Sequence, residues 1–61
     1  MVLVNLSKIR ESQGLTQKKL AEKLMFSERS VINWEGGKPT TSNNLKRIAI
    51  VLRVKPQELI N

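Results

Sequence analysis

The sequence predicts an all-α fold made of five short helices. Apolar residues recur at intervals of three and four along most of the chain, the spacing that places them on one face of a helix. Residue types that begin or end helices (Ser, Thr, Gly and Pro) interrupt this spacing repeatedly. With 61 residues and no cysteine, the chain is expected to form one domain over residues 1–61, held together by its apolar core without disulfides.

The first helix is predicted from about Leu3 to Gln13. Leu6 and Ile9 would lie on its inner face, because they are about one helical turn apart. Gly14 follows at the position where a glycine commonly ends a helix in the left-handed conformation.

Two short helices separated by a tight turn are predicted next. Thr16 is placed to cap a helix over about Gln17 to Leu24, and Ser27 to cap a helix over about Glu28 to Glu35. Two helices joined in this way form a helix-turn-helix.

The rest of the chain predicts a polar loop and two further helices. The loop spans Lys38 to Asn43 and supplies caps for a helix from about Asn44 to Leu52. Pro56 suits the first position of a last short helix that carries Leu59 and Ile60. The apolar positions of the second to fourth helices predict most of the core: Leu20, Ala21, Leu24, Val31, Trp34, Leu45, Ile48, Ala49 and Leu52.

Composition excludes most enzyme chemistry and favours a polyanionic partner. The chain has no His, Cys, Asp or Tyr, so it lacks the side chains of catalytic triads, thiol nucleophiles and the usual zinc sites. We therefore expect no enzyme, no metal, no cofactor and no small-molecule ligand. Eleven Lys and Arg against five Glu give a net charge of +6, which suits nucleic acid or an acidic membrane surface. The apolar stretches are far shorter than the roughly 20 residues of a membrane span, so we expect a cytoplasmic protein that does not enter membranes.

The outer face of the third helix carries side chains that can read base edges. Arg29 can donate a fork to guanine O6 and N7, and Asn33 can pair with adenine N6 and N7. Glu28 can accept from cytosine N4, although a glutamate in the first turn is also favoured by the helix dipole alone. For Ile32 three interpretations stay open: contact with a thymine methyl, packing on the protein, or contact with a partner.

The chain resembles the Cro/C1-type (XRE) helix-turn-helix DNA-binding domains of phage repressors and bacterial regulators. The matching residues are Ile9, Arg10, Gly14, Leu15, Thr16, Gln17, Leu20, Ala21, Glu22, Lys23, Leu24, Ser27, Val31, Trp34, Glu35, Gly37, Lys38, Leu45, Ala49, Leu52, Val54 and Leu59. This resemblance implies a lambda-repressor-like fold of five helices. It also implies a transcriptional regulator, a repressor by preference, that binds double-stranded operator DNA as a homodimer and inserts its third helix into the major groove.

The same resemblance assigns roles to individual residues. It implies a partly buried ion pair between Arg10 and Glu35 that ties the first helix to the third. Its base-contacting residues would be Glu28, Arg29 and Asn33. Its DNA-backbone contacts would be Gln17, Ser27, Lys38, Thr40, Thr41 and Asn43. The dimer surface would lie near the C-terminus, with Val54, Lys55, Pro56 and Leu59 or Ile60 as candidates.

The turn between the second and third helices departs from the family pattern. Met25 stands where a left-handed glycine is common, at a cost of roughly 1 kcal/mol if that geometry is kept, so the turn could instead be remodelled. Phe26 is larger than the usual residue, which could rotate or displace the third helix.

Two other functions stay open. One is an antitoxin or restriction-modification controller of the same fold. The other is a protein-interaction module without DNA binding, whose apolar patch would be Met25, Phe26 and Ile32.

Overall fold

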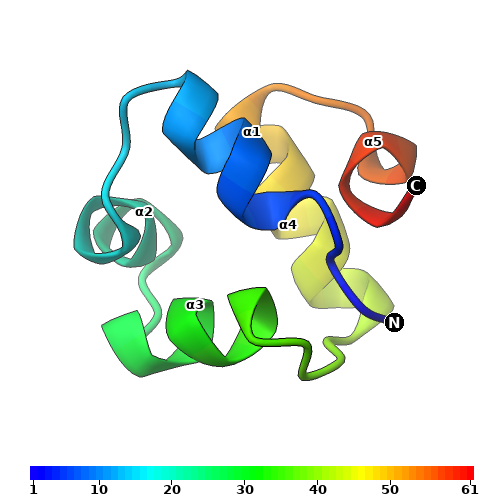
Figure 1. Ribbon diagram of the computed structural model, residues 1–61, viewed down its shortest axis with the longest axis horizontal. Helices are drawn as coiled ribbons and strands as arrows, with labels where there is room; N and C mark the ends of the chain where they lie inside the picture. The colour runs from blue at the N-terminus through cyan, green and yellow to red at the C-terminus, as the bar shows by residue number, and fades with distance from the viewer.

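Five α-helices surround one apolar core in the computed structural model, which describes residues 1–61 (Figure 1). The helices are α1 Leu6–Ser12, α2 Gln17–Leu24, α3 Glu28–Glu35, α4 Ser42–Leu52 and α5 Pro56–Ile60. No residue lies in a strand, so the predicted all-α class is confirmed. The predicted bounds of α2 and α3 are also confirmed. No helix has the length and apolar character needed to cross a membrane.

The helix α1 begins three residues later than predicted, at Leu6 and not at Leu3. The preceding Asn5 is hydrogen-bonded to the other end of the chain, because its backbone N–H donates to the Leu59 carbonyl at 3.1 Å. The Asn5 side chain donates to the carbonyls of Glu58 and Asn61. These contacts hold α5 against the start of α1 and fix a backbone that would otherwise extend the helix.

Hydroxyl side chains cap the three central helices. Each accepts a hydrogen bond from the backbone N–H three residues later: Thr16 from Lys19 at 3.0 Å, Ser27 from Ser30 at 3.3 Å, and Thr41 from Asn44 at 3.2 Å. The third cap lies earlier than predicted, because Thr41 occupies the capping position. Asn43 is therefore a residue of the first turn of α4 and not of the preceding loop.

The turn between α2 and α3 keeps the left-handed geometry without a glycine. Met25 has φ 62° and ψ 34°, so the turn is not remodelled. Arg53 has φ 58° at the end of α4, in the same conformation. Gly14 ends α1 with φ 71°, as predicted. A non-glycine residue in this region costs about 1 kcal/mol, so both Met25 and Arg53 carry strain.

The core contains the apolar positions predicted for α2, α3 and α4. Its twelve buried residues are Leu3, Leu6, Leu20, Ala21, Leu24, Val31, Trp34, Leu45, Ile48, Ala49, Leu52 and Leu59. Ile9, predicted to face inward, is half-buried at the edge of this core, and the fully inward position one residue later belongs to Arg10. Leu59 has no exposed surface, so its proposed place on a dimer surface is wrong for the folded chain.

Candidate nucleic-acid interface

One face of α3 is buried in the core, while the other carries polar side chains that have no partner in the protein. Val31 and Trp34 are buried, with 0% and 7% of their surface exposed. Glu28 and Arg29 are exposed and Asn33 is half-buried, and none of the three makes a side-chain hydrogen bond or ion pair. The helix therefore presents three polar groups to solvent from a backbone whose orientation is set by packing.

The spacing of these side chains places them along one side of α3. Arg29 and Asn33 are four residues apart, so they lie one above the other. Ile32 lies between Glu28 and Arg29 in angle and is 36% exposed, outside the buried core. Ile32 is therefore not a core residue, and part of its surface is open to a thymine methyl or a partner.

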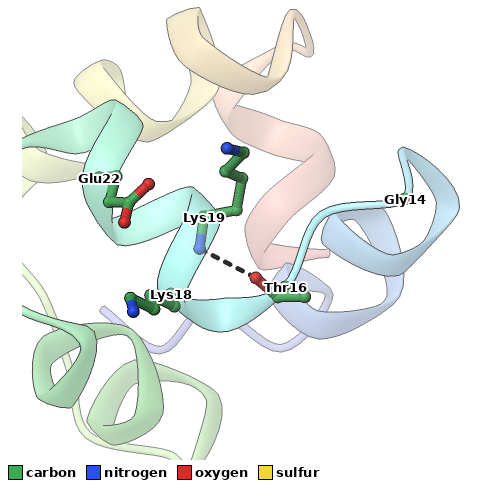
Figure 2. Close-up of a pocket in the computed structure, with 5 residues that line it drawn as sticks. All are labelled: Gly14, Thr16, Lys18, Lys19 and Glu22. Carbon is green, nitrogen blue, oxygen red and sulfur yellow. Dashed lines mark hydrogen bonds between the residues drawn. The ribbon is translucent and has the colours of Figure 1, made fainter.

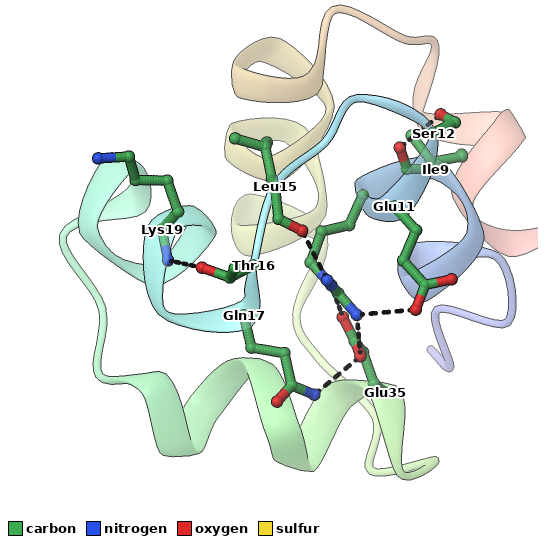
Figure 3. A network of polar contacts seen from close by, with 9 residues as sticks. Ile9, Glu11, Ser12, Leu15, Thr16, Gln17, Lys19 and Glu35 are labelled. Carbon is green, nitrogen blue, oxygen red and sulfur yellow. Dashed lines mark hydrogen bonds and ion pairs between the residues drawn. The ribbon is translucent and has the colours of Figure 1, made fainter.

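The C-terminal end of α3 is tied to α1 by a buried pair of charges. Arg10 Nε donates to Glu35 Oε2 at 2.6 Å, and Arg10 Nη2 donates to Glu35 Oε1 at 3.2 Å. Their side chains are only 9% and 10% exposed. A further donor of the same guanidinium, Nη1, reaches the Leu15 carbonyl at 2.6 Å (Figure 3). This forked geometry satisfies three donors of a charged group that burial would otherwise penalise.

The environment of Arg10 favours its charged form. The hydrogen bond to Glu35 raises the pKa of Arg10 above its ordinary value, against the opposing effect of burial, and the charges of Glu35 and Glu11 add to the increase. Arg10 therefore stays protonated at every pH at which the protein would be used.

Gln17 directs its side chain to the same cluster of charges. Its Nε2 donates to Glu35 Oε1 at 3.0 Å, and Figure 3 shows the amide reaching toward Glu35. Its backbone N–H and that of Lys18 have no hydrogen-bond acceptor in the protein, because they belong to the first turn of α2. What Gln17 offers to a phosphate in this conformation is its backbone N–H and not its side-chain donor.

The loop after α3 uses its backbone donors internally. The N–H of Lys38 donates to the Asn33 carbonyl at 3.0 Å, so only its exposed side chain remains free. The N–H of Thr40 donates to the Met1 carbonyl at 2.7 Å, and the Thr40 hydroxyl is buried without a partner. Thr40 therefore presents no donor to a phosphate in this conformation.

Free donors reappear at the start of α4. The backbone N–H groups of Thr41, Ser42 and Asn43 have no acceptor in the protein, and all three residues are exposed. Thr41 Oγ1 accepts the cap bond, which leaves its own hydroxyl hydrogen available to donate. The first turn of α4 is thus a cluster of donors at the positive end of a helix dipole.

Residues 6–59 match the sequence profile of the helix-turn-helix family. The chain belongs to the Cro/C1-type helix-turn-helix family. The match covers α1 to α4 and all of α5 except Ile60, with α2 and α3 as the helix-turn-helix itself, and it suggests DNA as the partner. The chain matches no curated protein and no solved structure at a significant level.

The helix-turn-helix has a further contact that the sequence did not predict. Arg47 of α4 reaches the turn between α2 and α3, where its Nη2 donates to the Leu24 carbonyl at 2.7 Å. Its guanidinium also lies over the Phe26 ring, 4.8 Å from the centroid. Nothing in the sequence signals this contact, because Arg47 lies on the polar side of an amphipathic helix and its partners are more than twenty residues away.

A hollow of about 380 Å³ lies beside the helix-turn-helix at the N-terminal end of α2 (Figure 2). Its lining is polar throughout and consists of Gly14, Thr16, Lys18, Lys19 and Glu22. Sites for small organic ligands are lined mainly by apolar side chains, which this hollow lacks. No group of acidic or other metal-binding side chains converges anywhere in the chain.

Proposed function

We propose that this helix-turn-helix domain is a sequence-specific transcriptional regulator that inserts α3 into the major groove of an operator. The proposal rests on the contrast between the two faces of α3. Its inner face is buried in the core, and the polar side chains of its outer face make no hydrogen bond or ion pair within the protein. Glu28, Arg29 and Asn33 have no partner in the protein, so a DNA base can engage them without breaking an internal contact.

Base readout is assigned by side-chain chemistry. Arg29 donates a fork to guanine, and Asn33 pairs with adenine. Glu28 accepts from the amino group of cytosine, and Ile32 contacts a thymine methyl with its exposed surface.

Backbone contacts come from groups on either side of α3. Ser27 keeps an exposed hydroxyl at its start, Lys38 follows its end, and Thr41 and Asn43 add donors from the first turn of α4. Gln17 contributes its free backbone N–H at the start of α2. The net charge of +6 favours such contacts with a polyanion, because each phosphate neutralised releases condensed counterions.

Repression by occupancy is the simplest regulatory use of this interface. A repressor needs only to cover its operator, whereas an activator also needs a surface that recruits the polymerase. A single α3 reads one half-site, so we propose a homodimer on two half-sites about one helical turn apart. An antitoxin or a restriction-modification controller would read DNA in the same way. A cytoplasmic location follows from the DNA partner.

The structure does not favour the interaction module without DNA binding. That function needs an apolar patch of Met25, Phe26 and Ile32, but Phe26 is half-buried against Trp34. Met25, at 87% exposed, and Ile32 remain as separate apolar residues, and isolated exposed apolar side chains are normal on protein surfaces.

The proposal is tested by selecting preferred sites from random duplex DNA with the wild-type chain. Arg29→Ala and Asn33→Ala are then compared with wild type on the selected site and on scrambled duplex. We expect each to weaken binding to the selected site by about 1–3 kcal/mol and to leave its melting temperature nearly unchanged, because base-edge contacts carry the sequence information. Lys8→Ala is the charge control for Arg29, since Lys8 is exposed on α1 and lines a hollow together with Gln57 and Glu58 of α5. Figure 1 shows α5 on the far side of α1 and α4 from α2. If both variants prefer the selected site over scrambled duplex as strongly as wild type does, α3 does not recognise the base sequence.

A further inference from the structure

A single side chain of α4 holds both sides of the turn that precedes α3. Arg47 Nη2 donates to the Leu24 carbonyl, the last residue of α2, at 2.7 Å. Its guanidinium lies 4.8 Å from the ring centroid of Phe26, which comes just before the cap of α3. Between these two contacts is Met25, in the left-handed conformation that favours glycine.

The contact with Leu24 satisfies a group that the helix leaves free. The last carbonyls of a helix have no backbone N–H of their own helix to bond, and they carry the negative end of its dipole. A guanidinium at this position supplies a charged donor to such a carbonyl. Arg47 therefore fixes the end of α2 from outside the helix-turn-helix.

The contact with Phe26 reaches α3 through a second aromatic ring. Phe26 and Trp34 meet edge to face, with centroids 5.3 Å apart and ring planes at 88°. Trp34 is the buried neighbour of Asn33, so the rotation of Trp34 in the core sets the direction in which Asn33 points. Arg47, Phe26 and Trp34 thus form a continuous chain of contacts from α4 to the inner face of α3.

We propose that Arg47 is a positioning residue for DNA readout, which sets the angle of α3 relative to α2 and contacts no base itself. The inference rests on the proposed function, in which α3 reads the operator. Paired hydrogen bonds to a base edge tolerate little displacement, because donor and acceptor must be within about 2.7–3.2 Å of each other. A small rotation of α3 therefore removes base contacts and leaves the less demanding attraction to phosphates in place.

The test compares Arg47→Met with Lys46→Met. Each change removes one positive charge from the same turn of α4, and Lys46 is exposed and makes no hydrogen bond or ion pair. Methionine keeps the apolar stem of the side chain, so packing is largely retained. Binding to the selected operator and to random duplex is measured at a temperature at which circular dichroism shows every variant folded.

We expect Arg47→Met to lower the preference for the operator over random duplex about tenfold, whereas Lys46→Met keeps the wild-type preference. Binding of the two variants to random duplex should be equal. Phe26→Leu should lower the preference in the same way, and the double variant should lose less than the sum, because the two residues act through the same chain of contacts.

A second substitution keeps the test decisive if Arg47→Met does not fold. Arg47→Lys retains the charge but lacks the planar fork that bonds Leu24 and stacks on Phe26 together, so its preference should also fall. Full wild-type preference in either Arg47 variant would overturn the inference. It would also be overturned if Arg47→Met weakened operator and random duplex equally and lowered the salt dependence more than Lys46→Met does, since Arg47 would then be a phosphate contact.

Failure of this inference is distinguishable from failure of the proposed function. If the wild-type chain selects no preferred site, readout by α3 is wrong and Arg47 has nothing to position. If wild type and Lys46→Met prefer a site and folded Arg47→Met prefers it equally, α3 reads DNA and only the role of Arg47 is wrong.

Discussion

Removal of the buried charge pair between α1 and α3 is the perturbation with the largest predicted effect on stability. Arg10→Met and Glu35→Leu each remove one charge and keep an apolar side chain of roughly similar length. The double variant removes both charges together. The four proteins form a double-mutant cycle that separates the value of the pair from the value of each side chain.

The expected magnitudes come from the contacts. Either single change leaves the other charge with a side chain about 10% exposed and without its main partner, which costs about 3–5 kcal/mol. The double change leaves no unpaired charge. It still removes the acceptor of Gln17 Nε2 and the donor to the Leu15 carbonyl, at about 1 kcal/mol each, so we expect a loss of about 1–2 kcal/mol.

The single variants are expected to be barely folded. A chain of 61 residues has a free energy of unfolding of about 3–9 kcal/mol, comparable with the loss from either single change. Since 1 kcal/mol corresponds to about 4–8 °C in a domain of this size, each single variant should melt at least about 12 °C below wild type. The double variant should melt well above either single one.

The cycle is measured by urea unfolding followed by circular dichroism, with the same concentration of a stabilising osmolyte for all four proteins. A coupling energy of about 4 kcal/mol or more is expected. Strict additivity of the two single effects, within about 0.5 kcal/mol, would refute the reasoning, because it would mean that neither charge depends on the other.

Three further predictions concern single features. Lys38→Ala should weaken binding to operator and random duplex alike and lower the salt slope by about one unit, because only its side chain is free; an unchanged slope would remove Lys38 from the interface. Met25→Gly should raise the melting temperature by a few degrees, since about 1 kcal/mol of left-handed strain is released and partly offset by added chain entropy; a lower melting temperature would show that the exposed methionine makes a stabilising contact. The raised pKa of Arg10 means that its stabilising effect is fully present below the ordinary pKa of an arginine and is lost only as the pH rises through the raised value. Melting temperatures should therefore show no step from this pair between about pH 6 and 9, and a step that the double variant lacks would contradict the assignment.

Local signals predicted the helix-turn-helix well because its boundaries are set locally. Thr16 and Ser27 cap α2 and α3 through hydrogen bonds that span three residues, and such bonds depend on little else in the chain. The start of α4 was harder, because Thr40, Thr41, Ser42 and Asn43 can all cap a helix. The backbone of Thr40 pairs with Met1, thirty-nine residues earlier, which leaves Thr41 as the cap.

The contacts that individual site side chains make depend on partners that are distant in sequence. Gln17 is predicted to bind a phosphate because it begins a helix, but its amide donor is 3.0 Å from Glu35 in the structure. Thr40 belongs to a polar loop, yet its hydroxyl is buried. Helical periodicity describes which side of a helix is apolar and says nothing about which polar group two helices bring together.

Two arginines on different helices fix α3 at its two ends. Arg10 of α1 holds Glu35, the last residue of α3, while Arg47 of α4 acts on Phe26, just before the cap of that helix. Neither contact involves the outer face, where Arg29 and Asn33 have no partner in the protein. Because the stabilising contacts and the proposed reading side chains are on opposite sides of α3, replacing Arg29 or Asn33 should change the preferred operator with little change in the free energy of unfolding. A large loss of stability on exchanging Arg29 or Asn33 for other polar residues would contradict this separation of roles.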